Sequence, residues 1–286
     1  MYLIPNLTIV VVSYKSGNIF YRSIKILNRI AKIICIENSD NKEFKKEIEK
    51  KYDNLKCILA NKNLGFGNAC NLILKEKTNK YLLFINPDAI SDRNSILKLI
   101  NFIKHNNSTG IIAPINYKRK NKIWDRYGYY SKKKSTQDEM HSNVDFTYGH
   151  MFLMKRDLFK NLNGFDKKYF LYFEDMDLCY RVRKKGLNIT ILKTSKVLHL
   201  EQKSTKFNDT KIQRIRAWHY GWGIVNFYKN NFSTIFFLKK IIPKFFLYFI
   251  TFFLCLFLLK KKSIIYYFYQ LYGMLISFFG IKSYYR

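Results

Sequence analysis

The first 115 residues alternate short apolar stretches with longer amphipathic ones, and this alternation restricts the fold more than any other feature of the chain. The apolar stretches are rich in Ile, Val and Leu, as in strands that are buried on both faces. We predict strands at residues 8–14, 32–38, 55–60, 81–89 and 111–116. We predict helices between them at residues 18–31, 41–52, 68–78 and 92–105. Elements in this order form a mostly parallel sheet covered by helices, so the predicted fold class is α/β.

The pattern becomes less regular after residue 116. Residues 117–145 are polar and contain three consecutive lysines, so we predict a long loop or hairpin over the ligand site. We predict a strand at residues 146–156, a helix at 174–186 and two short strands within 188–201. Gly186 is placed to end that helix, and Ser91 is placed to cap the helix that begins at residue 92.

The C-terminal part of the chain has a different composition. From Thr210 to Arg286 there are 12 Lys or Arg residues and no Asp or Glu. Residues 211–230 have the pattern of a basic, aromatic amphipathic helix. Two uncharged runs follow, at residues 245–259 and 263–281, with three lysines between them. Basic residues combined with long apolar runs indicate a surface for anionic lipid.

The tail is expected to lie on a membrane surface rather than to cross the membrane. The 15 residues 245–259 make about 22 Å of helix, whereas a bilayer core is about 30 Å thick. A spanning hairpin would also place the lysines at 260–262 outside, against the positive-inside tendency. We therefore predict a domain at residues 1–205 and a tail at residues 206–286 whose helices lie in the cytoplasmic leaflet. A spanning segment and an interface for a soluble partner are the alternatives.

The chain carries a formal charge of +31, from 51 Lys and Arg against 20 Asp and Glu. This excess has two interpretations. One is attraction to an anionic partner such as nucleic acid, phosphates or a membrane, and the other is a general richness in Lys, Asn and Ile that follows base composition. The five cysteines are scattered, which indicates neither a disulfide framework nor a zinc site and suits a reducing cytoplasm. The apolar stretch near the N-terminus lacks the features of a signal peptide.

Polar residues follow two of the predicted strands. Asn38 to Asp40 come after the second strand, and Asn86, Pro87 and Asp88 come after the fourth. In a parallel sheet these ends meet at one edge, where ligands bind. Asp88 is a hard oxygen ligand suited to Mg²⁺ or Mn²⁺ carrying phosphate oxygens, although the same three residues also favour a simple turn. A lone His199 on a strand is structural unless it faces the same metal as Asp88.

Two further segments have chemical potential. Residues 61–71 place glycines before a helix, which favours anions, but they lack the full dinucleotide-binding motif. Glu174 and Asp175 begin the helix at 174–186 beside aromatic residues, which would raise a carboxyl pKa and suit it to general-base catalysis. An ordinary acidic first turn is the alternative. Asp177 and Arg181 are spaced to pair along the helix, so their role is structural.

Taken in order, these segments resemble family-2 glycosyltransferases of the GT-A fold, particularly the rhamnosyltransferase-like branch. The segments are VVSYKS (11–16), IENSD (36–40), NKNLGFGNACN (61–71), INPDA (85–89), GHMFLMKR (149–156), GFDKKYFLYFEDMDLCYRVRKKG (164–186) and His199. Each segment is weak alone, but seven in order with fitting spacing, over about residues 5–205, are specific. The resemblance implies a GT-A (Rossmann-like) catalytic domain, with the membrane-associating helices as a C-terminal extension.

The resemblance also implies roles for individual residues. Those that would hold the nucleotide sugar are Ser13, Tyr14, Glu37, Asn63, Gly65, Asn71, Asn86 and Asp88. Asp88 would bind a metal–diphosphate, with Mg²⁺ or Mn²⁺ as the cofactor, and His199 would complete the metal site. Asp175 would be the catalytic base, and Glu174 would help to bind the acceptor. The family's DxD element is reduced here to Asn-Pro-Asp, which leaves one carboxylate for the metal.

The function implied is an inverting, metal-assisted glycosyltransferase with a dTDP-rhamnose or UDP-hexose donor. It would extend a bacterial cell-surface glycan of the lipopolysaccharide, O-antigen or capsule type, on a lipid-linked or oligosaccharide acceptor at the cytoplasmic face of the inner membrane. One alternative is a nucleic-acid-binding protein, given the charge, 22 Tyr and 25 Phe. The aromatic residues lie in apolar runs rather than on an open face, so no nucleic acid is expected. A catalytically inactive GT-A membrane scaffold is the other alternative.

Overall fold

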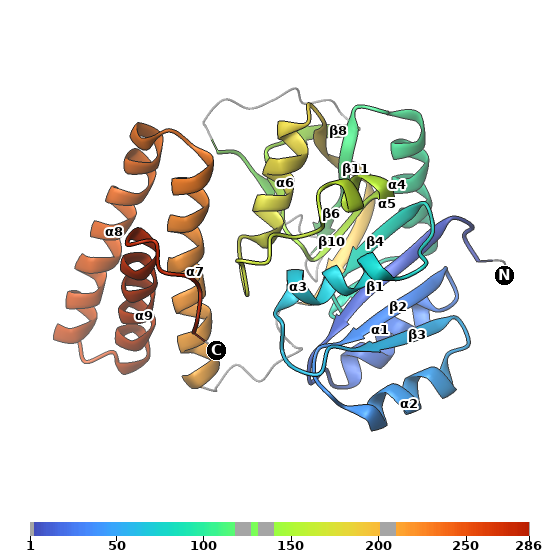
Figure 1. The fold of residues 1–286 in the computed structure, drawn as a ribbon, viewed down its shortest axis with the longest axis horizontal. Coiled ribbons are helices and arrows are strands. Elements are labelled where there is room, and N and C mark those ends of the chain that lie inside the picture. The colour runs from blue at the N-terminus through green and yellow to red at the C-terminus, as the bar shows by residue number, and fades with distance from the viewer. Residues whose placement is uncertain (1–2, 118–126, 131–139, 201–209, 286) are drawn as a thin grey trace. The chain divides into compact units, whose positions relative to one another are not determined.

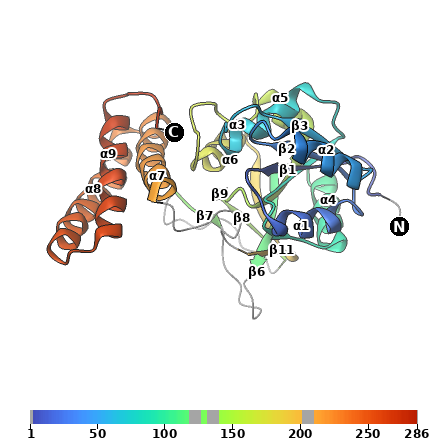
Figure 2. The ribbon, with the colours of Figure 1, turned by 90° about the horizontal axis from the view of Figure 1, so that it is seen from below.

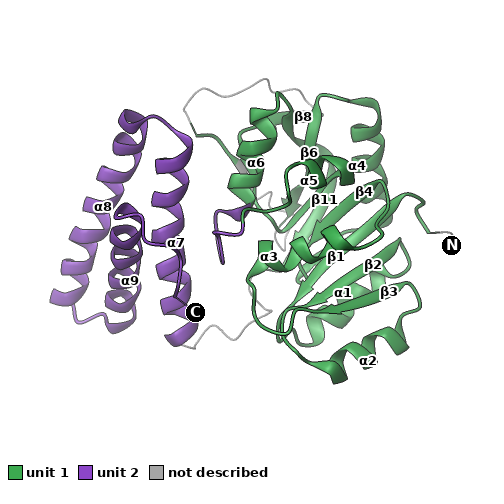
Figure 3. Ribbon diagram, in the orientation of Figure 1, with its two compact units in different colours: residues 1–166, 175–205 green, residues 167–174, 206–286 purple. Residues whose placement is uncertain are grey.

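A computed structural model of the protein describes residues 3–117, 127–130, 140–200 and 210–285. The chain divides into two compact units, which Figure 3 shows in different colours. The α/β unit contains residues 1–166 and 175–205, and the helical unit contains residues 167–174 and 206–286. The short segment 167–174 therefore belongs to the helical unit, although the sequence places it in the middle of the predicted catalytic domain.

One mixed sheet forms the centre of the α/β unit (Figure 1). Its strands among the described residues are β1 (Leu7–Ser13), β2 (Lys32–Glu37), β3 (Leu55–Leu59), β4 (Tyr81–Ile85), β5 (Ala89–Ile90), β6 (Thr109–Tyr117), β8 (His141–Val144), β10 (Met151–Lys155) and β11 (Asn188–His199). The order is β3-β2-β1-β4-β10-β6-β11-β5, and β8 pairs with β11. The first four strands are parallel, whereas β10 runs antiparallel between β4 and β6. Two short strands, β7 (Tyr127–Gly128) and β9 (Phe146–Thr147), pair separately.

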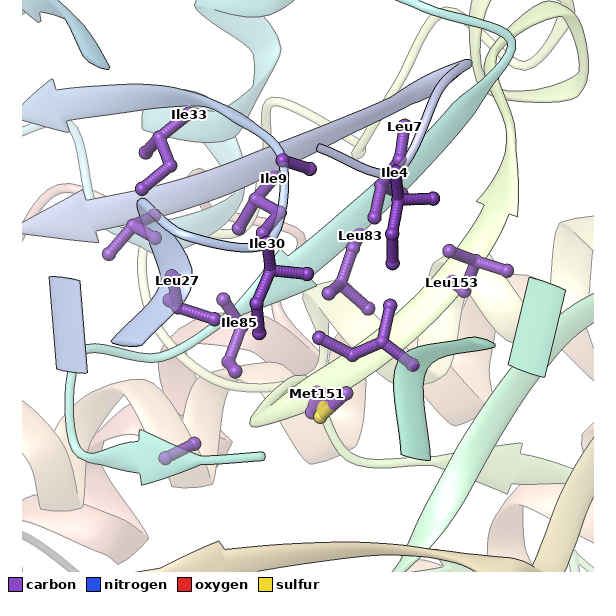
Figure 4. Close-up of a cluster of buried hydrophobic side chains, with 14 of the residues drawn as sticks. Ile4, Leu7, Ile9, Leu27, Ile30, Ile33, Leu83, Ile85, Met151 and Leu153 are labelled. Carbon is purple, nitrogen blue, oxygen red and sulfur yellow. The ribbon is translucent and has the colours of Figure 1, made fainter. Parts of the chain in front are cut away.

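Helices cover both faces of this sheet, as predicted. They are α1 (Asn18–Leu27), α2 (Lys42–Lys51), α3 (Phe66–Cys70), α4 (Arg93–His105), α5 (Arg156–Asn161) and α6 (Glu174–Lys184), with a 3-10 turn at Asn71–Lys75. Figure 2 shows α1 and α4 on one side of the sheet and α3 and α5 on the other. Side chains of β1, β4 and β10 form the core between the sheet and α1, including Ile9, Leu83 and Leu153, which are fully buried (Figure 4). This burial stabilises the frame that carries the strand ends.

The strand register brings the polar strand ends together. Ser13, the last residue of β1, pairs with Glu37, the last residue of β2. Both side chains are buried at the carboxyl edge of the sheet. The polar residues that follow these strands therefore share one edge, as expected for parallel strands.

Several predicted elements have different ends in the structure. The N-cap of α4 is Asp92, whose Oδ1 accepts a hydrogen bond from the Ser95 N–H at 2.6 Å. The predicted cap, Ser91, instead donates its hydroxyl to the Lys196 carbonyl at 2.9 Å. The strand predicted at 81–89 ends at Ile85, because the turn after it lets β5 pair with β11. The helix predicted at 68–78 is a short α-helix followed by the 3-10 turn.

Two further predictions about strands were wrong. The two short strands expected within 188–201 are one strand, β11, with a register shift against β6 between Leu192 and Lys196. The polar residues there look like a turn in the sequence, but they form a bulge that lets the strand continue. The strand expected at 146–156 is divided into β9 and β10. The loop predicted at 117–145 lies partly outside the described residues, and within the described part it contains β7 and β8.

The helical unit contains α7 (Thr210–Asn231), α8 (Thr234–Phe257) and α9 (Lys261–Phe278). Helices α7 and α9 approach closely because each has a glycine at the contact. A β-carbon on Gly221 would overlap the Gln270 carbonyl, and one on Gly273 would overlap the Trp218 carbonyl. Figure 1 shows α8 beside this pair.

Helix α8 is longer than the uncharged run at 245–259, because it begins near its Ser233 cap and continues through three lysines. Its 24 residues make about 36 Å of helix, more than the ~30 Å core of a bilayer. Within the described part of the chain, it is the one helix whose length and composition would allow a membrane crossing. The length argument against spanning, which rested on 15 residues, therefore does not hold.

Candidate active site

A pocket of about 540 Å³ opens at the carboxyl ends of β1 and β2. Its lining residues are Ser13, Lys15, Ser16, Glu37, Ser39, Asp40, Asn41, Glu43 and Phe44. The buried Glu37 carboxylate accepts a hydrogen bond from the Ser39 hydroxyl at 2.6 Å. A carboxylate, several hydroxyls and an aromatic ring in one concave site suit a polar ring system with a hydroxylated sugar. Ser13 and Glu37, both predicted to bind the nucleotide, line this pocket, and Tyr14 follows Ser13 directly.

Asn38 holds the glycine-containing loop beside this pocket. Its amide nitrogen donates to Asn63 Oδ1 at 3.0 Å and to the Gly65 carbonyl at 3.3 Å, while its Oδ1 accepts from the Leu64 N–H at 2.8 Å. Asn63 and Gly65, two predicted donor-binding residues, are therefore fixed next to the end of β2. Gly65 has a φ of 78°, which glycine adopts without strain. Asn38, one of the polar residues expected at the end of the second strand, is thus the residue that holds this loop.

Asn71 has different contacts from those that the resemblance implies. Its amide nitrogen donates to the Phe165 carbonyl at 2.9 Å, and its Oδ1 accepts from the Phe165 N–H at 2.8 Å. Gly164 packs so closely that a β-carbon there would overlap the Asn71 side chain. Asn71 therefore braces the chain before α6, and the pocket lining does not include it.

Asp88 and His199 come together through strand pairing. Because β5 pairs with β11, Ala89 lies opposite His199, and His199 Nε2 lies 3.2 Å from Asp88 Oδ1. The His150 ring stacks on His199 with centroids 5.2 Å apart. The His150 carbonyl also accepts the Asn86 N–H at 2.9 Å. His199 thus faces Asp88, the condition on which its interpretation as a metal ligand depended. The sequence analysis did not single out His150.

This pair of side chains fits a divalent metal only with help from the donor. It offers one carboxylate and one imidazole, and His199 Nδ1 is buried without a hydrogen-bond partner among the described residues. Carboxylate, imidazole and phosphate oxygens together suit Mn²⁺ or Mg²⁺. Within the described ranges, no group of three or more His, Cys, Asp or Glu side chains could hold a metal. Diphosphate oxygens would have to complete the coordination.

Asp175 lies in the first turn of α6 and binds the backbone with both oxygens. Oδ2 accepts from the Gly149 N–H at 2.8 Å, and Oδ1 accepts from the Met176 N–H at 2.8 Å. Burial raises the pKa of the Asp175 carboxyl, and these backbone hydrogen bonds lower it by less. The expected direction of the pKa shift is confirmed. A carboxylate that is costly to keep charged is a stronger base.

The other acids of this segment have separate roles. Arg181 Nε donates to Asp177 Oδ2 at 2.7 Å, which confirms the predicted pair. Arg181 also donates to the carbonyls of Leu162 and Gly164, at 2.9 Å each, so the pair holds α6 to the preceding chain. Glu174 is buried at the start of α6, directly before Asp175.

Comparison with known proteins decides the family. The model of the family described as "Glycosyl transferase family 2" matches residues 8–162, more than half of the chain. The chain belongs to glycosyltransferase family 2. A second model, described as "N-terminal domain of galactosyltransferase", matches residues 133–203 of this glycosyltransferase. The family predicted from the ordered motifs is therefore confirmed.

Similar proteins of known name include transferases of rhamnose and hexose. The rhamnosyltransferase WbbL of Escherichia coli K12 is 26% identical over 212 residues, covering 66% of this chain and 78% of that protein. An N-acetylglucosaminyl-diphospho-decaprenol L-rhamnosyltransferase of Mycobacterium tuberculosis is 22% identical over 237 residues, covering 70% and 77%. The low-salt glycan biosynthesis hexosyltransferase Agl10 of Haloferax volcanii is 22% identical over 208 residues, covering 65% of this chain. This glycosyltransferase spans only 64% of the length of Agl10.

Solved structures share the fold at low sequence identity. The mannosyltransferase PcManGT of Pyrobaculum calidifontis, in complex with GDP-Man and Mn²⁺, has a TM-score of 0.62 at 10% identity, covering 96% of this chain and 88% of that chain. GalNAc-T7, with UDP, GalNAc and Mn²⁺, has a TM-score of 0.58 at 15% identity, covering 83% and 56%. The predicted fold is confirmed: it is α/β, with a GT-A-like mixed sheet flanked by helices.

Proposed function

We propose that this protein is an inverting glycosyltransferase that transfers a sugar from a nucleotide-diphosphate sugar, dTDP-rhamnose or a UDP-hexose, to a growing cell-surface glycan. The observation that carries the proposal is the pair of neighbouring residues Gly149 and His150. The Gly149 N–H binds Asp175, and His150 stacks on His199, which faces Asp88. Two adjacent residues thus contact the proposed base on one side and a proposed metal ligand on the other, which supports placing both in one site.

The donor would bind with its nucleoside in the pocket at β1 and β2. Ser13, Tyr14 and Glu37 would hold the base and ribose, with Asn63 and Gly65 beside them. The Glu37 carboxylate can accept hydrogen bonds from ribose hydroxyls or base N–H groups. Asn86 would lie next to the diphosphate.

Asp88 and His199 would hold a Mg²⁺ or Mn²⁺ ion, which when bound supplies charge neutralisation for the diphosphate leaving group. The solved structures with Mn²⁺, one with GDP-Man and one with UDP and GalNAc, support a metal of this class. The single carboxylate of the Asn-Pro-Asp turn makes His199 the second protein ligand. His150 would hold the His199 ring in place by stacking.

Asp175 would accept the proton of the acceptor hydroxyl as that oxygen attacks the anomeric carbon. The bond between the anomeric carbon and the diphosphate oxygen breaks in the same step, so the configuration inverts. Each Asp175 oxygen accepts one backbone hydrogen bond, which orients the carboxylate and leaves a lone pair for the proton. Glu174 would bind acceptor hydroxyls.

The acceptor we propose is lipid-linked, of the kind named for the mycobacterial relative. Two features support an acceptor at a membrane: the exposed apolar side chains of α8, and a chain without acidic residues from Thr210 onward. Both favour an anionic lipid surface. The protein would act at the cytoplasmic face of the inner membrane, bound peripherally or shallowly inserted, in the synthesis of a lipopolysaccharide, O-antigen or capsule glycan.

Replacement of the proposed base tests this function. Asp175→Asn keeps the size of the side chain and removes its basicity, so donor binding should persist and transfer should fall by at least about 100-fold. Donor binding is measured as a thermal shift across nucleoside diphosphates with and without Mn²⁺, and transfer as release of nucleoside diphosphate. Transfer at the wild-type rate in Asp175→Asn would refute the assignment of the base. Absence of any metal-dependent release from the wild-type protein would favour an inactive scaffold.

A further inference from the structure

The segment 167–174 is attached to helix α7 of the helical unit. The Tyr169 ring contacts Trp222 with centroids 5.9 Å apart, and its hydroxyl accepts from Asn226 Nδ2 at 2.9 Å. The Phe170 ring lies 4.9 Å from His219. These contacts explain why Figure 3 groups the segment with the C-terminal helices. The segment ends at Glu174, and the next residue along the chain is Asp175.

The end of the segment has an unusual backbone. Tyr172 and Phe173 have φ values of 66° and 69°, a left-handed conformation that residues with a β-carbon rarely adopt. Packing against α7 offsets this strain, because the Phe173 ring lies directly against Gly223. A β-carbon on residue 223 would overlap this ring. The Phe173 ring also contacts Tyr220, with centroids 5.5 Å apart. Such strain in two consecutive residues occurs mainly at functional sites.

The left-handed turn brings Tyr172 to one face of α7. The Tyr172 ring lies 6.1 Å from the Tyr220 ring. Arg216 precedes Tyr220 by four residues and so lies on the same helical face. Burial raises the pKa of Tyr172, and the nearby positive charge of Arg216 lowers it by less. Arg216 and Tyr220 thus lie near Tyr172, two residues before Glu174 in the chain.

Helices α8 and α9 add three tyrosines to this group. Tyr248 of α8 forms a side-chain hydrogen bond with Tyr220. Its ring lies 5.8 Å from Tyr267 of α9, which contacts Tyr266 at 5.4 Å. We call the five residues the tyrosine cluster: Tyr172, Tyr220, Tyr248, Tyr266 and Tyr267.

The same helix that provides Tyr248 carries a large exposed apolar surface. Six side chains in its second half are each more than half exposed: Phe246, Leu247, Ile250, Phe253, Leu254 and Phe257. Tyr248 directly follows Leu247. A polar, cationic cluster beside exposed hydrocarbon is complementary to an amphiphile with an anionic head and an apolar chain.

We propose that Arg216 and the tyrosine cluster form a subsite for the phosphate-bearing end of the lipid-linked acceptor, whose hydrocarbon chain lies along the exposed apolar side chains of α8. An arginine fork matches phosphate oxygens, and neutral phenols donate further hydrogen bonds. Glu174 then meets the hydroxyls of the acceptor sugar. The subsite deepens the proposed function and rests on it for the identity of the acceptor.

The test measures binding of farnesyl diphosphate to the full-length protein in detergent micelles. Farnesol and inorganic diphosphate serve as probes for the two halves of the ligand. Farnesyl diphosphate should bind at least about tenfold more tightly than either one. Arg216→Gln should weaken this binding by about tenfold or more, and Tyr220→Phe by about fivefold, because each removes a hydrogen bond to phosphate.

Arg214→Gln is the matched control. Arg214 lies two residues earlier on α7, stacks on Tyr269 and carries the same charge. Its replacement should leave farnesyl diphosphate binding unchanged. Thermal shifts with nucleoside diphosphates report that each variant is folded and binds the donor. If Arg216→Gln fails to fold, Arg216→Lys replaces it, and loss of the planar fork should still weaken binding.

Three outcomes would refute the subsite. One is an equal loss of affinity in Arg216→Gln and Arg214→Gln, which would indicate non-specific charge. Another is equal binding of farnesyl diphosphate and one of its halves, which would indicate an apolar surface or an anion site alone. The third is wild-type affinity of Arg216→Gln for farnesyl diphosphate. If the wild-type protein transfers sugar normally, this result refutes the subsite and leaves the proposed function standing. Failure of donor binding and transfer in the wild-type protein refutes the function alone.

Discussion

Apolar side chains are buried in the sheet of the α/β unit, whereas many of those on α8 of the helical unit are exposed. Strands β1 and β4 are buried along their whole length, with Ile9 and Leu83 without exposed surface. Helix α8 is equally apolar, yet Phe257 is 86% exposed and Leu254 is 54% exposed. A strand in the middle of a helix-covered sheet has neighbours on every side, whereas a helix that is apolar all round needs more surface than two helices provide. The exposed side chains of α8 form the surface that we propose contacts a membrane.

The two units also differ in charge. The α/β unit places its acids where chemistry is expected, at Glu37, Asp88 and Asp175, and pairs others such as Asp177 with arginine. The helical unit has no acidic residue from Thr210 onward. A site that binds a metal ion and accepts a proton needs carboxylates, whereas a surface that binds anionic lipid does not.

The largest expected effect tests the difference in burial. Leu83→Ala, in β4, should lower the free energy of unfolding by about 2–5 kcal/mol, because it leaves a cavity in the core. Leu254→Ala, the same change on the exposed surface of α8, should alter it by less than about 0.5 kcal/mol. Chemical denaturation of both variants in detergent measures the two values. A loss at Leu254 as large as that at Leu83 would show that α8 is buried by protein.

A second prediction concerns the apolar surface of α8 itself. Replacing both Phe253 and Phe257 by Glu should reduce binding to vesicles of phosphatidylethanolamine and phosphatidylglycerol by at least about tenfold, since each phenylalanine contributes about 1.5–3 kcal/mol when it leaves water. Sedimentation with vesicles measures the binding. The matched control, Lys46→Gln and Lys50→Gln on exposed positions of α2 in the other unit, lowers the net charge by the same amount without touching α8. Unchanged vesicle binding by the Phe variant would favour a soluble partner for this surface.

The smallest expected effect is a pH dependence located in the α/β unit. A general base must be deprotonated, and burial raises the pKa of Asp175 above the ordinary 3.8 of an aspartate. Activity should therefore be full at neutral pH and should fall, as the pH is lowered, at a higher pH than an exposed aspartate would give. The acid limb of the kcat/KM profile measures this, with a folding check by circular dichroism. A limb at or below pH 3.8 would contradict the raised pKa.

Much of the α/β unit could be predicted because its signals are local. The strands predicted at 8–14, 32–38 and 55–60 agree with β1, β2 and β3 within one residue, since continuous β-branched runs have few other stable conformations. Element ends were less certain: Ser91 and Asp92 are both good caps, and only the position of the Ser95 N–H selects Asp92. The bulge in β11 was read as a break, because polar residues in a strand and in a turn look alike.

The candidate site also contains residues that the sequence indicates and contacts that only the structure shows. Asp88 and Asp175 were singled out by their residue types at the ends of predicted elements, and Glu37 by the resemblance to the family. The contacts of Asn38, Gly149 and His150 were not predicted, because they are made with residues far along the chain or through the backbone. Asn71, a predicted nucleotide-binding residue, uses its amide to brace Phe165, a contact that its motif position does not reveal.

The sequence by itself determined the α/β class, the family and the identity of the principal acids, because these depend on periodicity and on short motifs. Only the tertiary structure decided that β5 pairs with β11 and so brings His199 to Asp88, because that contact joins residues more than a hundred positions apart. It also decided that segment 167–174 belongs with the C-terminal helices. The aromatic side chains of this segment pack against residues of α7, which lie far from the segment in the sequence.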